Sequence, residues 1–348
     1  MKLTVRCIVV ILLFISSYQI SFAQTESPVA YMNAISNAQL DMNQRYMAYV
    51  SAAAHGRRAR KVEKMRQQTL ESINNARYKT IELPIYKGDN SLRQSSIDYI
   101  KLCYNVFNDD YARIVNMEEI AEQSVDQMQA YLLLQEKTSE KLKQASDKMN
   151  EAEKAFAAKN NITLTEEKSE LGDKMEIAGK LTKYNNHVYI VFFKCNWEDG
   201  EITKALNNKK VNDAEQARVA LLNYVNEGLQ ALQADSLRAF MGDASLANAC
   251  RQVLNFYKKM AETDLPKQID FYLKQENFNK IKRAMDAKPN KTQQDIDEYN
   301  KAVKEMNAGV NSFNQAVQNI NTQRSTILNN WDAAEKAFND THMPYYKR

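Results

Sequence analysis

Three histidines are the residues of this chain that could most readily serve as metal ligands or general bases. They are His55, His187 and His342, and the residues three positions before them are Ala52, Tyr184 and Asn339. Di-iron helical bundles place a glutamate at that position, where it shares the metal with the histidine. We therefore expect no metal, no cofactor and no catalytic residue built on these histidines.

Three cysteines, Cys103, Cys195 and Cys250, lie beyond the N-terminal segment and are the candidate nucleophiles. Cys195 is eight residues from His187, which is about 12 Å along a helix and too far for the imidazole to activate the thiol. An odd number of cysteines cannot pair completely, so disulfides are not the main support of the fold. We expect buried, unreactive thiols.

An acidic run at residues 197–201 is the remaining candidate for cation binding. It contains Glu198, Asp199 and Glu201 around Gly200. It lacks the alternating ligands of a calcium loop. We expect it to form a helix surface with a local bend.

A basic cluster could contact an anionic partner, either lipopolysaccharide phosphates or an anionic membrane. Its members are Arg57, Arg58, Arg60 and Lys61, and a weaker pair, Lys209 and Lys210, occupies the matching turn later in the chain. The alternative is a solvated helix start, because basic runs are common on protein surfaces. Any membrane contact would be peripheral.

Two Gly-Asp pairs, Gly88-Asp89 and Gly242-Asp243, read as structural turns. Glycine permits a positive φ, and an aspartate can accept hydrogen bonds from the first amides of the helix that follows. We interpret both pairs as part of the architecture, with no binding role.

Composition indicates long helices. The 348 residues include only 8 Gly and 5 Pro, so glycine-rich loops that bind phosphates or dinucleotides are scarce. The hydrophobic fraction is 44%, which can supply a core. Without Lys2 and Arg6 the chain carries 45 bases and 43 acids, so we expect no nucleic-acid partner.

Residues 1–23 have the pattern of a signal peptide. Lys2 and Arg6 precede an apolar run at residues 7–15, and Ser21-Phe22-Ala23 places small residues at the cleavage site. The run is too short for a membrane anchor, which needs about 20 apolar residues. We expect cleavage before Gln24 and a location in the periplasm or on the outer cell surface.

The chain contains an apparent internal duplication. Residues 31–33 (Tyr-Met-Asn) recur at 184–186 (Tyr-Asn-Asn), and 86–92 recur at 240–246, with offsets of 153 and 154. The pentapeptide Ala-Glu-Lys-Ala-Phe at 152–156 returns at 334–338, an offset of 182. The larger offset predicts an insertion near residues 282–300.

Apolar residues at three- and four-residue steps, such as Tyr31, Ile35, Ala38 and Met42, predict an all-α fold. We expect two tandem antiparallel bundles of about four helices, at residues 24–160 and 183–348, joined by a connector at 161–182. In the first bundle, a helix of roughly 25 residues from Tyr31 is expected to end at a turn at 55–58. The second helix should carry residues 62–76 and end before Pro84, the third should carry 92–106, and the fourth should run from about 117 to 156. The run Val188–Phe193 resembles a strand by propensity, but its counterpart in the first copy has helical spacing, so we predict a buried helix.

These features together resemble an uncharacterised family of exported, tandem-helical surface or periplasmic proteins of Gram-negative bacteria. The resemblance rests on the leader ending Phe22-Ala23-Gln24, the Tyr-x-Asn helix start, the Gly-Asp turns and the Ala-Glu-Lys-Ala-Phe helices. It implies a location outside the cytoplasm and carries no catalytic residues.

The sequence leads us to expect a non-catalytic helical protein of the cell envelope that binds a protein or glycan, or has a structural role. Two alternatives stay open. One is an envelope enzyme with a carboxylate-lined cleft between the bundles, and the other is a protein that adheres to anionic membranes or lipopolysaccharide.

Overall fold

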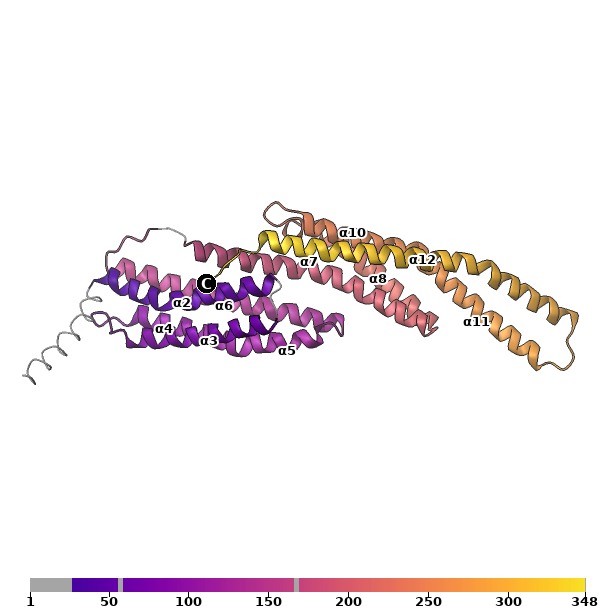
Figure 1. The fold of residues 1–348 in the computed structure, drawn as a ribbon, viewed down its shortest axis with the longest axis horizontal. Helices are drawn as coiled ribbons and strands as arrows, with labels where there is room; N and C mark the ends of the chain where they lie inside the picture. Colours follow the sequence, from indigo (N-terminus) through magenta and orange to yellow (C-terminus); the bar gives the residue numbers. More distant parts are fainter. Residues whose placement is uncertain (1–26, 56–58, 166–168, 348) are drawn as a thin grey trace, which may run out of the picture. The chain divides into compact units, whose positions relative to one another are not determined.

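The computed structural model describes residues 27–55, 59–165 and 169–347. It is all-α, as predicted, and within these residues the only β-type pairings are two isolated bridges, Tyr86 with Asp89 and Phe240 with Asp243. The chain forms two compact units (Figure 1). Unit 1 comprises residues up to 121, 130–180 and 342–348, and unit 2 comprises 122–129 and 181–341.

Unit 1 begins with two long helices, α2 (Pro28–Ala54) and α3 (Ala59–Glu82). The next rod consists of α4 (Ser91–Asn105), the π-helix η1 (Val106–Asp110) and α5 (Tyr111–Ala121). The helix α6 (Val125–Lys159), which belongs to this unit from residue 130 onward, returns along it. Ser27 starts α2 because its hydroxyl accepts a hydrogen bond from the Ala30 N–H at 3.1 Å, and Pro28 fits the first helical turn.

Two apolar clusters hold unit 1 together. One gathers Met42, Ile73, Ile100 and Phe107. The other contains an aromatic triad of Tyr31, Tyr86 and Phe156, whose ring centroids are 5.1, 5.7 and 5.3 Å apart. The apolar stripe read from the sequence of α2 is therefore the face that packs into the core.

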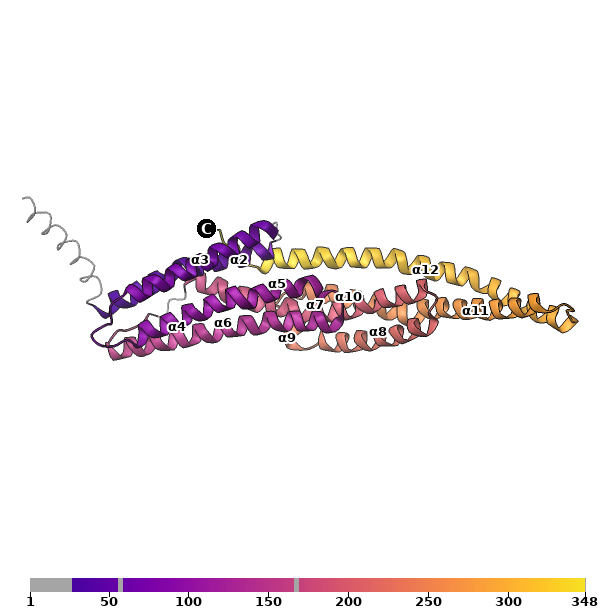
Figure 2. The same ribbon diagram turned by 90° about the horizontal axis from the view of Figure 1, so that it is seen from below.

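Unit 2 has the same kinds of elements in the same order, with one additional short helix, α9 (Asp235–Arg238). Its other elements are α7 (Glu170–Asn207), which belongs to this unit from residue 181 onward, α8 (Val211–Ala231), α10 (Ser245–Lys259), the π-helix η2 (Met260–Asp264), α11 (Leu265–Ala287) and α12 (Gln293–His342). Figure 1 and Figure 2 both show α11 and α12 side by side as far as the turn at 288–292.

The strand-like run Val188–Phe193 is helical, as predicted, and lies within α7. Val188 is fully buried, and the Phe192 ring stacks on Trp331 of α12 with centroids 4.5 Å apart. Val191 packs on Gly228 of α8. A Cβ atom added to Gly228 would lie 2.7 Å from Cγ1 of Val191. Tertiary packing on several sides thus explains why the run is apolar all round.

Matched positions in the two units have matching local geometry. The π-helices, the two bridges and the helices α4 and α10 are offset by 154 residues. In unit 2, Tyr184, Phe240 and Phe338 repeat the aromatic triad with centroids 5.5, 5.6 and 6.2 Å apart. These pairs agree with a duplication, which stays a prediction.

Several boundaries differ from the prediction. The third helix of unit 1 continues through η1 to Ala121, and the turn at 122–124 precedes the long helix, which starts at Val125 instead of about 117. A π-helix keeps the rod continuous, and no residue type marks it in the sequence. Residues 170–182, predicted as connector, are part of α7.

The C-terminal residues 342–348 belong to unit 1, whereas the sequence assigned them to the second bundle. Met343 is buried, and the ring of Tyr345 lies 3.8 Å from that of His55 at the end of α2. The Tyr346 N–H also donates to Ser51 Oγ at 3.1 Å. Contacts across almost the whole chain cannot be read from local spacing.

None of the described helices combines the length and the hydropathy that a membrane-spanning segment requires. The predicted signal peptide at residues 1–23 lies outside the described residues.

Candidate functional site

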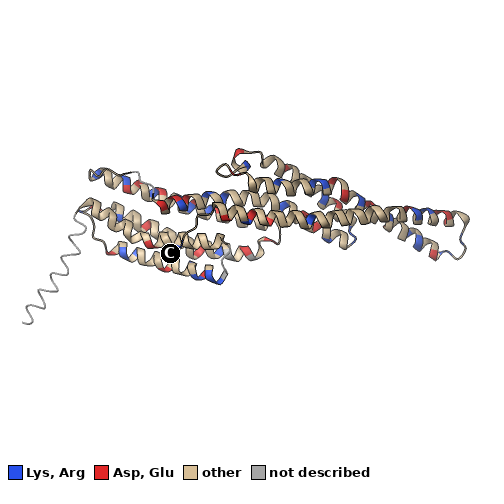
Figure 3. Cartoon of the chain, turned by 45° about the horizontal axis from the view of Figure 1, so that its top comes forward, with Lys and Arg blue, Asp and Glu red and all other residues tan. Residues whose placement is uncertain are grey.

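The predicted basic cluster is only partly described. Arg57 and Arg58 lie outside the described residues, and Arg60 and Lys61 are exposed in the first turn of α3. Figure 3 shows lysine and arginine interspersed with aspartate and glutamate along the helices. Such mixing is typical of a solvated surface and reduces the field of any single basic group.

The weaker basic pair sits at the turn between α7 and α8. Lys209 has a φ of 57°, and Lys210 precedes the first residue of α8. The ammonium of Lys210 lies 3.4 Å from the Asp213 carboxylate in an exposed ion pair. Part of its charge is therefore balanced locally.

Both Gly-Asp pairs close tight two-residue turns. Lys87 and Gly88 have φ values of 46° and 83°, and Met241 and Gly242 have 50° and 89°. Positive φ at both central residues is the type I′ geometry, in which glycine avoids a steric cost. After the first turn, Asp89 Oδ1 accepts from the Ser91 N–H at 2.9 Å.

Asp243 repeats this contact in unit 2, because its Oδ1 accepts from the Ser245 N–H at 2.8 Å. In unit 1 the Asp89 carboxylate also binds the Lys159 ammonium at 2.8 Å. That contact and the Ser91 hydrogen bonds lower the pKa of Asp89 to about 2. Both aspartates therefore position the helices that follow them.

The three thiols are buried and free. Burial raises the pKa of Cys103 and of Cys250 to about 12, and it raises the pKa of Cys195 above the usual range. A thiol is a nucleophile only as the thiolate. These cysteines are thus poor nucleophiles at neutral pH.

The histidines occupy three separate places. The ring of His55 packs on Tyr345, with its Nδ1 2.7 Å from the Ser51 carbonyl oxygen. His187 is half-buried in α7, and His342 ends α12. Among the described residues no group of histidine, cysteine, aspartate or glutamate side chains has the geometry of a metal site.

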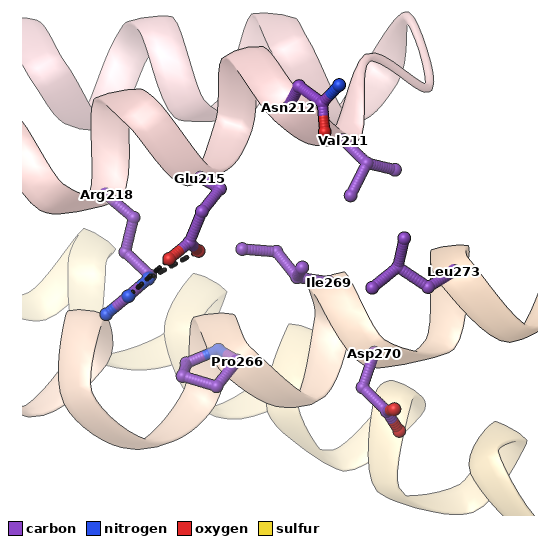
Figure 4. A pocket seen from close by; sticks show the side chains of 8 residues that line it. All are labelled: Val211, Asn212, Glu215, Arg218, Pro266, Ile269, Asp270 and Leu273. Carbon is purple, nitrogen blue, oxygen red and sulfur yellow. Dashed lines mark hydrogen bonds and ion pairs between the residues drawn. The ribbon is translucent and has the colours of Figure 1, made fainter.

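A groove between α8 and α11 is the candidate binding site that the structure reveals (Figure 4). Its volume is about 360 Å³. Its lining is formed by Val211, Asn212, Glu215, Arg218, Pro266, Ile269, Asp270 and Leu273. Figure 4 shows Glu215 and Arg218 at one end and the aliphatic side chains of Val211, Ile269 and Leu273 at the other.

The polar end of the groove is fixed by an ion pair. Arg218 donates to both Glu215 oxygens, at 2.8 and 2.5 Å, and its third donor bonds the Ala261 carbonyl of η2 at 3.0 Å. Within a π-helix that carbonyl would pair with the N–H five residues later, but Pro266 has none. The guanidinium satisfies the carbonyl instead.

The same ion pair sets the protonation of the groove. The hydrogen bonds from Arg218 lower the pKa of Glu215, and Glu215 raises the pKa of Arg218. A carboxylate with a lowered pKa is a weak general base at neutral pH. This end of the groove is suited to binding a polar group rather than to proton transfer.

Unit 1 has a related arrangement beside its own π-helix. Arg66 donates to both Glu63 oxygens, at 2.9 and 3.0 Å, and to the Phe107 carbonyl of η1 at 2.9 Å. A second cavity of about 320 Å³ lies between α2 and α3, lined by Arg45, Ala48, Met65 and Gln68. The Glu-x-x-Arg spacing could have indicated both ion pairs from the sequence, because it places the two side chains on one helix face.

A second ion pair in unit 2 is buried. Arg324 of α12 donates to both oxygens of Asp199 of α7, at 2.7 and 2.6 Å. The prediction of a bent surface for residues 197–201 was therefore wrong at Asp199, which is 5% exposed within an unbroken helix. Arg324 could have indicated this buried pair from the sequence, because it replaces an apolar residue in the heptad pattern of α12.

Other carboxylates with raised pKa lie on separate elements. Burial raises the pKa of Glu153 in α6, of Glu198 in α7 and of Glu335 in α12. None of these three residues lines the groove or the cavity between α2 and α3.

Comparisons with protein-family models, with curated proteins and with solved structures gave no match to the chain.

Proposed function

We propose that the chain is an exported, non-catalytic protein of the cell envelope that binds a partner through its helical surfaces. The groove between α8 and α11 carries this proposal. It joins an aliphatic lining, in which Leu273 is 49% exposed, to a preformed Glu215–Arg218 pair. A few fixed polar groups beside apolar walls are the usual composition of a binding pocket.

The groove favours a protein segment over a free small molecule. Its volume of about 360 Å³ is near the lower limit for small-molecule pockets. Its apolar end lies between two helices, where an amphipathic segment can place its anchor residues. A polar group next to those anchors can bond the Glu215–Arg218 pair. Glycan binding is the less favoured form of the same proposal.

The binding test compares two substitutions in unit 2. A photoreactive residue at position 273 captures the partner from envelope extracts, and the purified partner is then titrated with the chain from Gln24 onward. We expect Leu273→Glu to weaken binding at least about tenfold, because it places a charge in the aliphatic end of the groove. Val219→Glu is the matched control, since Val219 is 46% exposed outside this lining. Equal binding by both variants would overturn the proposed site.

Export is tested separately. The envelope fraction should contain the chain with Gln24 at its N-terminus, as expected from the small residues at 21 and 23. Recovery of the protein only from the cytoplasm would remove the envelope part of the proposal.

Anionic-membrane adhesion makes a different prediction. Vesicles containing anionic lipid should then bind the chain in a salt-sensitive manner, and Arg57→Glu with Arg58→Glu should abolish binding. The pairing of Lys210 with Asp213 makes this the weaker proposal.

A further inference from the structure

The distal part of the α11–α12 hairpin, residues 274–310, has an incompletely buried apolar seam. Figure 1 and Figure 2 show this hairpin continuing past the turn that joins α7 to α8. Its seam consists of Phe278, Ile281 and Met285 of α11 and Ile296, Tyr299, Val303, Met306 and Val310 of α12. All of them remain partly exposed, and Ala302 is the one buried apolar side chain of this stretch.

The seam has the spacing of a coiled coil. In α12, Ile296, Tyr299, Val303, Met306 and Val310 alternate at three- and four-residue steps, which is the pattern of a and d positions. The Phe278 and Tyr299 rings lie 5.7 Å apart and join the two helices. Two helices alone cannot enclose such a stripe, and most helical stability comes from tertiary packing. A further helical layer would complete the burial.

The charges beside the seam are complementary between the two helices. The eight residues before the turn, 280–287 of α11, contain three bases and one acid, whereas the eight after it, 293–300 of α12, contain three acids and no base. Within the described chain, Lys282 and Arg283 of α11 and Asp297 and Glu298 of α12 form no ion pair. Lys282 directly follows Ile281, and Asp297 directly follows Ile296, so each group of charges borders the seam.

These charges lie at the same level of the hairpin. Arg283 and Lys282 are five and six residues before the turn at 288–292, and Asp297 and Glu298 are five and six residues after it. A two-fold axis along the hairpin places α11 of one copy against α12 of the other at equal height. Each basic pair then faces an acidic pair, twice by symmetry.

We propose that the distal hairpin is a self-association surface, on which a second copy of this chain packs with its turn pointing the same way. The two hairpins form a four-helix bundle around the apolar seam, and the Lys282-Arg283 and Asp297-Glu298 groups set its register.

The test is a charge exchange monitored by sedimentation equilibrium of the chain from Gln24 onward. The unchanged chain should form dimers. Lys282→Glu with Arg283→Glu should weaken the dimer about tenfold or more, because two attractive contacts become repulsive. Asp297→Lys with Glu298→Lys should have the same effect. An equimolar mixture of the two variants should recover dimers.

Lys148→Glu with Lys154→Glu in α6 is the matched control, since it makes the same change of charge at exposed positions of unit 1. It should dimerise like the unchanged chain. Helical circular dichroism verifies that each variant is folded. The proposal would be overturned if the unchanged chain were monomeric. It would also be overturned if either charge-reversed variant dimerised as well as the unchanged chain, or if the mixture of the two variants stayed monomeric.

Discussion

Removing the guanidinium of Arg324 should destabilise unit 2 strongly. Asp199 is enclosed, with a side chain 6% exposed, and Arg324 supplies both of its charge-assisted hydrogen bonds. Arg324→Met keeps much of the apolar stem but leaves a buried carboxylate without a counter-ion. Breaking a buried pair in this way costs about 3–5 kcal/mol, and a loss of this size lowers the Tm of a unit this large by roughly 10 °C.

The loss should depend on pH. Burial raises the pKa of Asp199, and the hydrogen bonds from Arg324 oppose that rise. Without Arg324 the folded-state pKa rises further above the unfolded value, so the folded state binds the proton more tightly. The variant is therefore weakest at neutral pH and recovers stability as the pH falls through the raised pKa, by at most about 1.4 kcal/mol per pH unit.

Urea unfolding at pH 7 and pH 5 measures both effects. Asp199→Asn in the Arg324→Met background should recover much of the loss at pH 7, because no charge is then buried. Lys204→Met is the control, since Lys204 and Glu201 form an exposed pair at 3.5 Å, and it should change the free energy of unfolding by under about 1 kcal/mol. A loss below about 1 kcal/mol for Arg324→Met, or an equal loss at both pH values, would refute this reasoning.

Three further predictions concern local geometry. Met241→Asn should raise the free energy of unfolding by about 0.5–1 kcal/mol, because asparagine tolerates the φ of 50° better than methionine does; a lower urea midpoint would contradict it. Gly228→Ala should lower the free energy of unfolding by about 1–3 kcal/mol, because the added methyl group overpacks against Val191. Adding Val191→Ala should recover part of this loss. An unchanged urea midpoint for Gly228→Ala would instead show that α7 and α8 can separate freely. The buried thiols should react with a thiol reagent at pH 8 only in denaturant, because burial raises their pKa; rapid labelling of the native chain would show that the thiols are accessible.

Helices whose formation depends on residues close together in the chain could be predicted from the sequence. The three- and four-residue spacing around Tyr31 and Ile35 predicted α2, and both residues are buried in its core face. The comparison of repeats correctly assigned Val188–Phe193 to a helix, against its strand propensity. Scarce glycine and proline predicted long rods, and α12 runs from Gln293 to His342.

Features that depend on distant partners were not predictable from local patterns. The groove needs Ile269 and Leu273 to lie beside α8, and the burial of Asp199 needs Arg324 from another helix. The π-helices η1 and η2 add no distinctive residue to the sequence, so they escaped prediction although they anchor Arg66 and Arg218. Packing, rather than propensity, decides these positions.

The docking of the C-terminal tail on α2 has a consequence for biosynthesis. The hydrogen bond from the Tyr346 N–H to Ser51 joins residues 295 positions apart, and Met343 becomes buried on the same unit. The helices of unit 1 can form while the ribosome is still making the chain, but their contact with the tail must wait until residues 343–346 have been made. Chains that lack residues 343–346 would leave the C-terminal end of α2 uncovered and easier for proteases to cut.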